Sequence, residues 1–144
     1  MSSLVTNPVF QAYAASAIAL GLNLIFIANA TAISRAKAGE GVNPEDGKTT
    51  VYHDGNDITQ RWIRAHRNAL ENLPLFLITA FLLTLTTVGA TFATVLFAIF
   101  VVTRWLHTIC YVKSVQPWRT AFFAIGSLTQ VVLLGALGYY VFAV

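Results

Sequence analysis

Apolar residues fill three long stretches of this chain, and the charged residues lie between them. The uncharged stretches are residues 1–34, 72–103 and 120–144. Because a helix needs about 20 residues to cross a bilayer, the first and last stretches each predict one spanning helix. The middle stretch is short for two helices unless each extends into neighbouring charged turns. With a tight turn near residues 88–90, the pattern predicts one domain, residues 1–144, with four transmembrane helices at about 8–34, 59–88, 91–113 and 117–143.

Composition supports this interpretation. Hydrophobic residues make up 56% of the chain and charged residues only 10%, which lies well outside the usage of soluble domains. We therefore expect an all-α integral membrane protein built as a four-helix bundle.

All charged side chains lie in residues 35–71 and 104–119. With four spans these segments share one side, and the positive-inside tendency makes that side, with the loop 35–58, cytoplasmic. We expect a bacterial inner membrane or an endoplasmic reticulum membrane. The net charge of +3 then reflects topology, and without a basic tail or module no nucleic-acid partner is expected. The single cysteine excludes an internal disulfide, and the three histidines lack metal-binding spacing, so no metal site is expected.

A polar stripe marks the start of the second predicted helix. Arg61, Arg64, Arg67, Asn68 and Glu71 fall within an arc of roughly 120° on a helix. The stripe runs directly into apolar sequence, so its inner end should lie at or below the lipid headgroups. Ionisable groups at that depth are costly and typical of functional sites.

Two further polar groups face the same end of the membrane. The third helix carries an arc of Arg104, His107, Thr108 and Tyr111. Arg119 lies at the start of the fourth helix, beside the positive end of its dipole. Five arginines against one glutamate are unfavourable in a low dielectric unless an anion is bound. A small ligand with carboxylates for the arginines and a donor for Glu71 would fit. Alternatively, the arginines extend to the headgroups and Glu71 pairs with one of them.

Four segments resemble, in the right order, the motifs of the family of membrane-associated proteins in eicosanoid and glutathione metabolism, the MAPEG family. They are Asn43–Asp46, Arg61–Asn72, Arg104–Tyr111 and Gln116–Arg119. The first of these also has the local chemistry of a simple helix cap. The resemblance covers nearly the whole chain, and the most similar branches are the microsomal glutathione transferases and the microsomal prostaglandin E synthases.

This resemblance implies a homotrimer that binds glutathione as co-substrate between neighbouring subunits, toward the cytoplasmic side. Glutathione has two carboxylates, an amine and a thiol, which fits the ligand expected from the charges. The residues implied to hold it are Arg35, Arg64, Arg67, Asn68, Glu71, His107 and Tyr111. Arg119 matches the arginine thought to stabilise the thiolate and is the catalytic candidate.

The expected activity is a detoxifying transfer of glutathione to lipophilic electrophiles, with reduction of lipid hydroperoxides as a possible peroxidase activity. Phe123 replaces a tyrosine of the prostaglandin synthase branch and Ser127 a glutamine, which argues against a dedicated isomerase. The family also includes a lipid-presenting member without enzymatic activity, so a non-catalytic lipid-binding membrane scaffold is the alternative. An ion conductor fits less well, because the charges cluster at one end instead of crossing the bilayer.

Overall fold

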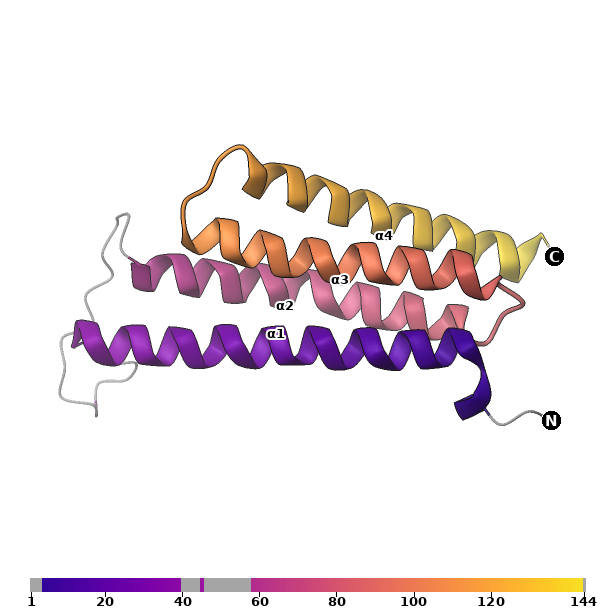
Figure 1. Ribbon diagram of the computed structural model, residues 1–144, viewed down its shortest axis with the longest axis horizontal. Helices are drawn as coiled ribbons and strands as arrows, with labels where there is room; N and C mark the ends of the chain where they lie inside the picture. The colour runs from indigo at the N-terminus through magenta and orange to yellow at the C-terminus, as the bar shows by residue number, and fades with distance from the viewer. Residues whose placement is uncertain (1–3, 40–44, 46–57, 144) are drawn as a thin grey trace.

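Four long helices run side by side as a bundle (Figure 1). A computed structural model describes residues 4–39, 45 and 58–143. After a short 3₁₀ turn, η1 (Leu4–Thr6), the helices are α1 (Pro8–Ala38), α2 (Ile58–Leu83), α3 (Ala90–Val112) and α4 (Trp118–Phe142). Both chain ends lie at the end of the bundle that holds the α2–α3 turn, and the α3–α4 turn lies at the other end (Figure 1). The predicted all-α architecture is confirmed.

The bundle has the dimensions and apolar character of a membrane domain. Three helices, α1, α3 and α4, are long and apolar enough to cross a bilayer. The 26 residues of α2 correspond to about 39 Å of helix, but its first half carries the polar stripe. The chain is an integral membrane protein in which α2 combines a charged first half with an apolar second half.

Two helix ends differ from the expected positions. α1 continues to Ala38 instead of ending at 34, and Gly39 then ends it with a left-handed backbone, φ 71°, a conformation that glycine adopts without strain. α2 ends at Leu83 instead of 88. The carbonyl of Leu83 accepts from both the backbone N–H and the hydroxyl of Thr86, at 3.1 and 2.8 Å. These bonds span three residues instead of four, so the chain leaves the α-helix here. Apart from Glu45, the motif at 43–46 lies outside the described residues.

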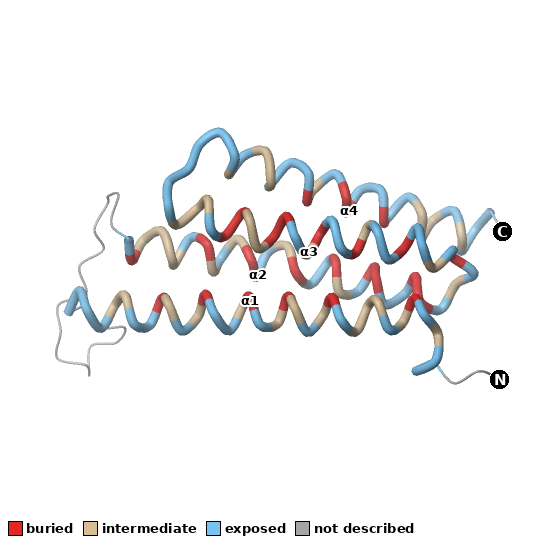
Figure 2. The backbone as a smooth tube through the Cα atoms, viewed as in Figure 1, coloured by how far each residue is buried: buried red, intermediate tan, exposed pale blue. Residues whose placement is uncertain are grey.

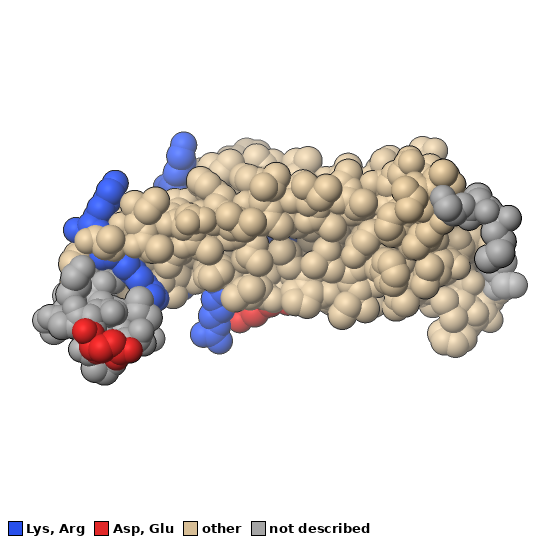
Figure 3. All heavy atoms as spheres, turned by 90° about the horizontal axis from the view of Figure 1, so that it is seen from below, with Lys and Arg blue, Asp and Glu red and all other residues tan. Residues whose placement is uncertain are grey.

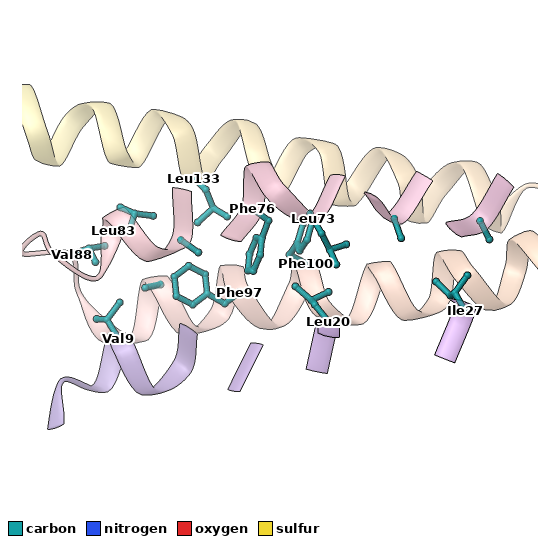
Figure 4. Packing of buried hydrophobic residues seen from close by; sticks show 14 residues of the cluster. Val9, Leu20, Ile27, Leu73, Phe76, Leu83, Val88, Phe97, Phe100 and Leu133 are labelled. Atoms are coloured by element: carbon teal, nitrogen blue, oxygen red, sulfur yellow. The ribbon is translucent and has the colours of Figure 1, made fainter. Parts of the chain in front are cut away.

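Buried residues recur along the side of each helix that faces the bundle (Figure 2). In the uncharged half, the ring of Phe76 from α2 stacks on Phe100 of α3 with centroids 4.2 Å apart. Phe97 packs edge-on against Phe76 at 5.7 Å, and Leu20 and Leu133 close the cluster from α1 and α4 (Figure 4). This core, whose aromatic rings come from α2 and α3, joins all four helices.

Charged side chains are distributed unevenly along the bundle. On the face seen in Figure 3, Lys and Arg gather toward the end that holds the α3–α4 turn, and the opposite half shows no charged side chain. This matches the expectation that the charged segments share one side of the membrane. The cytoplasmic assignment of that side stays a prediction.

Candidate functional site

A cleft of about 220 Å³ opens between α2, α3 and α4 toward the charged end of the bundle. The residues that line it are Asn68, His107, Tyr111, Arg119, Thr120 and Phe123. Four of the residues predicted from the sequence, Asn68, His107, Tyr111 and Arg119, thus come together within one chain. Asn68 comes from the polar stripe on α2, His107 and Tyr111 come from the polar arc on α3, and Arg119 comes from the start of α4.

Arg119 lies in the first turn of α4. Its guanidinium carbon is 5.0 Å from the ring centroid of Tyr111, a distance typical of a cation–π contact. The side-chain oxygen of Gln116 can accept from its Nε at 3.1 Å when the amide nitrogen is turned toward Thr120. Both partners are neutral, and the start of a helix adds partial positive charge. The cleft therefore presents a net positive field to a bound anion.

His107 connects this part of α4 to α3. Its Nδ1 lies 3.0 Å from the backbone oxygen of Arg119, and its ring packs at an angle against Tyr111 and Phe123, with centroids 5.6 and 5.8 Å away. The side chain is buried. The ring lies between the first turn of α4 and the interior of the bundle.

Arg104 lies deeper than any other described arginine, and the resemblance assigned it no role. Only 3% of it is exposed, and neither Nη1 nor Nη2 has a hydrogen-bond partner. Its guanidinium carbon lies 5.9 Å from the ring centroids of Phe100 and Phe123. A buried charge without a partner costs several kcal/mol. The signal in the sequence is an arginine in the middle of an apolar helix, one turn before His107.

Asn23 of α1 extends this polar interior and was not among the predicted site residues. It is 1% exposed and its Nδ2 has no acceptor, whereas its Oδ1 lies 3.5 Å from the hydroxyl of Thr108. Together with Asn68, Arg104 and His107 it surrounds a space too small for a water molecule. A dry polar layer thus separates the aromatic core from the cleft.

The other predicted site residues do not line the cleft of this chain. Arg64, Arg67 and Glu71 lie on the exposed side of α2. Arg67 Nε donates to Glu71 Oε1 at 3.0 Å, and these side chains are 81% and 56% exposed. These three residues occupy the sector of α2 next to Asn68, directed away from the bundle.

Arg35 lies in the last turn of α1. The neighbouring Ser34 hydroxyl is 2.7 Å from that of Thr59. On α2, Asn68 lies about 14 Å further along the helix than Thr59, at 1.5 Å per residue. One chain therefore contains the candidate site in separate parts, with Arg35 and the outer face of α2 away from the cleft.

Comparison with known proteins identifies a family and relatives of this chain. The model of the MAPEG family matches residues 13–139. Over 134 residues the chain is 35% identical to microsomal glutathione S-transferase 1 of Bos taurus, 34% to that of Sus scrofa and 32% to that of Homo sapiens. Each alignment covers 88% of this chain and 86% of the relative.

Proposed function

The chain belongs to the MAPEG family, and from this membership and the geometry of the cleft we propose that it is a glutathione-dependent membrane transferase. Glutathione binds as co-substrate, its thiol is converted to the thiolate, and the thiolate attacks lipophilic electrophiles that arrive from the membrane. The observation that carries this proposal is the position of Arg119. Its guanidinium lies in the cleft at the start of α4, and among the described residues no carboxylate forms an ion pair with it.

The energetic requirement on Arg119 is moderate. A thiol with a reference pKa near 8.5 is mostly protonated at pH 7, whereas the thiolate is the nucleophile. Lowering that pKa by ~2 units requires ~2.7 kcal/mol of preferential stabilisation of the anion. A guanidinium together with a helix N-terminus can supply this in a low dielectric. The Tyr111 hydroxyl is a further available donor.

The transfer forms a bond between sulfur and the electrophilic carbon, and the leaving group departs with its bonding electrons. We propose lipid hydroperoxides as a second class of substrate. In that reaction two glutathione molecules supply two electrons and become the disulfide. The O–O bond breaks, and the products are an alcohol and water. Phe123 and Thr120 line the cleft and are candidate contacts for the apolar substrate.

We propose further that the site is completed between copies in a homotrimer. Glu71 lies about 20 Å along α2 from its first residue, and charges facing hydrocarbon at that depth are unfavourable. A neighbouring copy that places its cleft against the outer face of α2 would cover Arg64, Arg67 and Glu71. Those residues and Arg35 would then contact the carboxylates and amine of glutathione, on the cytoplasmic side.

The test is titration of the purified protein with glutathione at neutral pH, followed by ultraviolet difference absorbance of the thiolate. We expect a thiolate band in the parent and its loss in Arg119→Ala, with the oligomer retained. Lys113→Ala removes an exposed cation at the same end of the bundle and should keep the band. An undiminished band in Arg119→Ala would remove Arg119 from the mechanism.

One feature favours the alternative of a non-catalytic lipid-binding scaffold. An apolar groove of about 580 Å³ lies at the other end of the bundle. The residues that line it include Leu82 of α2, Leu85 of the turn that follows α2, and Leu134, Leu137 and Phe142 of α4. Calorimetry separates the two functions, because a scaffold would show no binding of glutathione while retaining lipid.

A further inference from the structure

We propose that His107 contributes to the reaction by positioning Arg119 through the backbone, and not by contacting glutathione. This inference rests on the proposed function, since it concerns how the arginine beside the thiol is held. It makes His107 a positioning residue, in contrast to the direct ligand that the resemblance implies.

The protonation of the ring follows from its hydrogen bond. Nδ1 of His107 lies 3.0 Å from the backbone oxygen of Arg119. A carbonyl oxygen can only accept, so Nδ1 must carry the proton. In the neutral ring Nε2 is then an acceptor without a proton. The nitrogen that a ligand could use as a donor is already occupied by the protein.

The remaining nitrogen is not exposed in the cleft. Nε2 is buried and has no hydrogen-bond partner. His107 also lines the interior space shared with Asn23 and Arg104, which has no room for a water molecule. A glutathione molecule in the cleft would meet the side of the imidazole ring, next to Tyr111 and Phe123.

The bond between His107 and Arg119 holds the start of α4. Among the described residues it is the only hydrogen bond that joins α3 to α4. The Arg119 N–H donates to the carbonyl of Val115 in the connecting turn, at 3.1 Å, and this bond does not reach α3. Without His107 the first turn of α4 can shift relative to Tyr111. Misplacement of a catalytic group by about 1 Å can reduce a rate by about 100-fold.

Two variants separate positioning from direct contact. The amide nitrogen of asparagine lies as many bonds from Cβ as Nδ1 does in histidine. The amide nitrogen of glutamine lies as many bonds from Cβ as Nε2 does in histidine. His107→Asn therefore keeps a donor for the Arg119 carbonyl, and His107→Gln keeps a polar group at the position of Nε2. Both variants leave the titratable cleft residues Arg119 of α4 and Tyr111 of α3 unchanged, and the cleft residue from α2, Asn68, carries no charge. Arg104 of α3 also stays in place, at the interior space on the other side of His107.

The measurement is the ionisation constant of bound glutathione, from the thiolate absorbance as a function of pH. We expect His107→Gln to lower this constant about fivefold, the factor equivalent to one net hydrogen bond, and His107→Asn to recover most of that loss. The reverse order would show direct contact through Nε2, and equal losses would show that His107 only fills space. Either result would overturn the proposal.

A second measurement does not depend on glutathione. The nitrogen NMR shifts of the His107 ring should show a protonated Nδ1 and an unprotonated Nε2 in the free protein. A proton on Nε2 would refute the positioning role even if the parent formed no thiolate. A parent with the expected ring nitrogens but no thiolate band would contradict the proposed function instead.

Discussion

Replacing Arg104 by methionine should make the free protein more stable while weakening the binding of glutathione. Arg104 is almost completely buried, and both of its terminal nitrogens lack a partner. Methionine is unbranched and of similar length, and its sulfur packs well against aromatic rings. The rings of Phe100 and Phe123 already flank the site, each 5.9 Å from the guanidinium carbon.

The expected gain can be bounded from these contacts. Replacing buried charges with apolar residues of similar volume is often neutral or stabilising by about 1–4 kcal/mol. Two cation–π contacts stabilise the arginine and are lost in the variant. Burial strengthens such contacts, but both lie at 5.9 Å, close to the outer limit of the interaction, so we assign them about 0.5–1 kcal/mol each. We therefore expect Arg104→Met to raise the free energy of unfolding by about 1–2 kcal/mol.

The assay is equilibrium unfolding of the detergent-solubilised protein, without and with glutathione. A ligand at 100 times its Kd stabilises the folded state by about 2.7 kcal/mol, and this increment should shrink in Arg104→Met if the ligand anion compensates the guanidinium. Lys113→Met makes the same charge change at an exposed position and should change neither quantity.

The result that would refute this reasoning is a loss of stability. If Arg104→Met unfolds more easily than the parent by about 3 kcal/mol, Arg104 has a structural partner in the free protein, such as a carboxylate of a second copy. If glutathione raises the free energy of unfolding of Arg104→Met as much as that of the parent, the ligand does not interact with this charge.

Two further predictions concern the packing of α4. A Cβ on Gly126 would lie 3.3 Å from Thr103 Oγ1, whereas one on Gly135 would meet no atom within 4 Å. Gly126→Ala should therefore be less stable than Gly135→Ala by about 1 kcal/mol in the same unfolding assay. Equal stabilities would show that the Thr103 side chain can move to make room for the added methyl group at no cost. Gln130 Nε2 donates to the carbonyl of Asn72 at 2.8 Å, so Gln130→Leu should cost about 0.6 kcal/mol, the average for such bonds within membranes; a gain in stability would contradict this.

Much of the fold could be predicted because the bilayer restricts the possibilities. The spacing of apolar and charged stretches was sufficient for four helices and their approximate positions. The ends of α1 and α2 were not predictable from hydrophobicity, because local bonds determine them. Thr86 closes the end of α2 in a segment that is still apolar enough to continue the helix. Polar caps of this kind leave little trace in a hydropathy pattern.

The candidate site could be predicted only in part. Helical spacing shows which residues share an arc on one helix, but not how that arc is rotated toward neighbouring helices. Asn68 and Arg67 are adjacent in sequence, yet Asn68 lines the cleft and Arg67 is exposed. The unpaired Arg104 and the link from His107 to Arg119 depend on packing between helices. Neither can be read from one helix alone.

The position of Arg104 implies that ligand binding and stability are coupled in this bundle. One turn of α3 separates the stacked ring of Phe100 from the guanidinium of Arg104, so the aromatic stack lies directly beside a buried charge without a hydrogen-bond partner on its terminal nitrogens. Stacked aromatic pairs contribute about 0.5–1.5 kcal/mol beyond burial, which helps the bundle to tolerate that charge. An anion that reaches the guanidinium would relieve an unfavourable interaction already present in the free protein. Part of the affinity for such a ligand would then come from the instability of the empty site. The decrease, in Arg104→Met, of the stabilisation that glutathione gives to the folded protein measures that part.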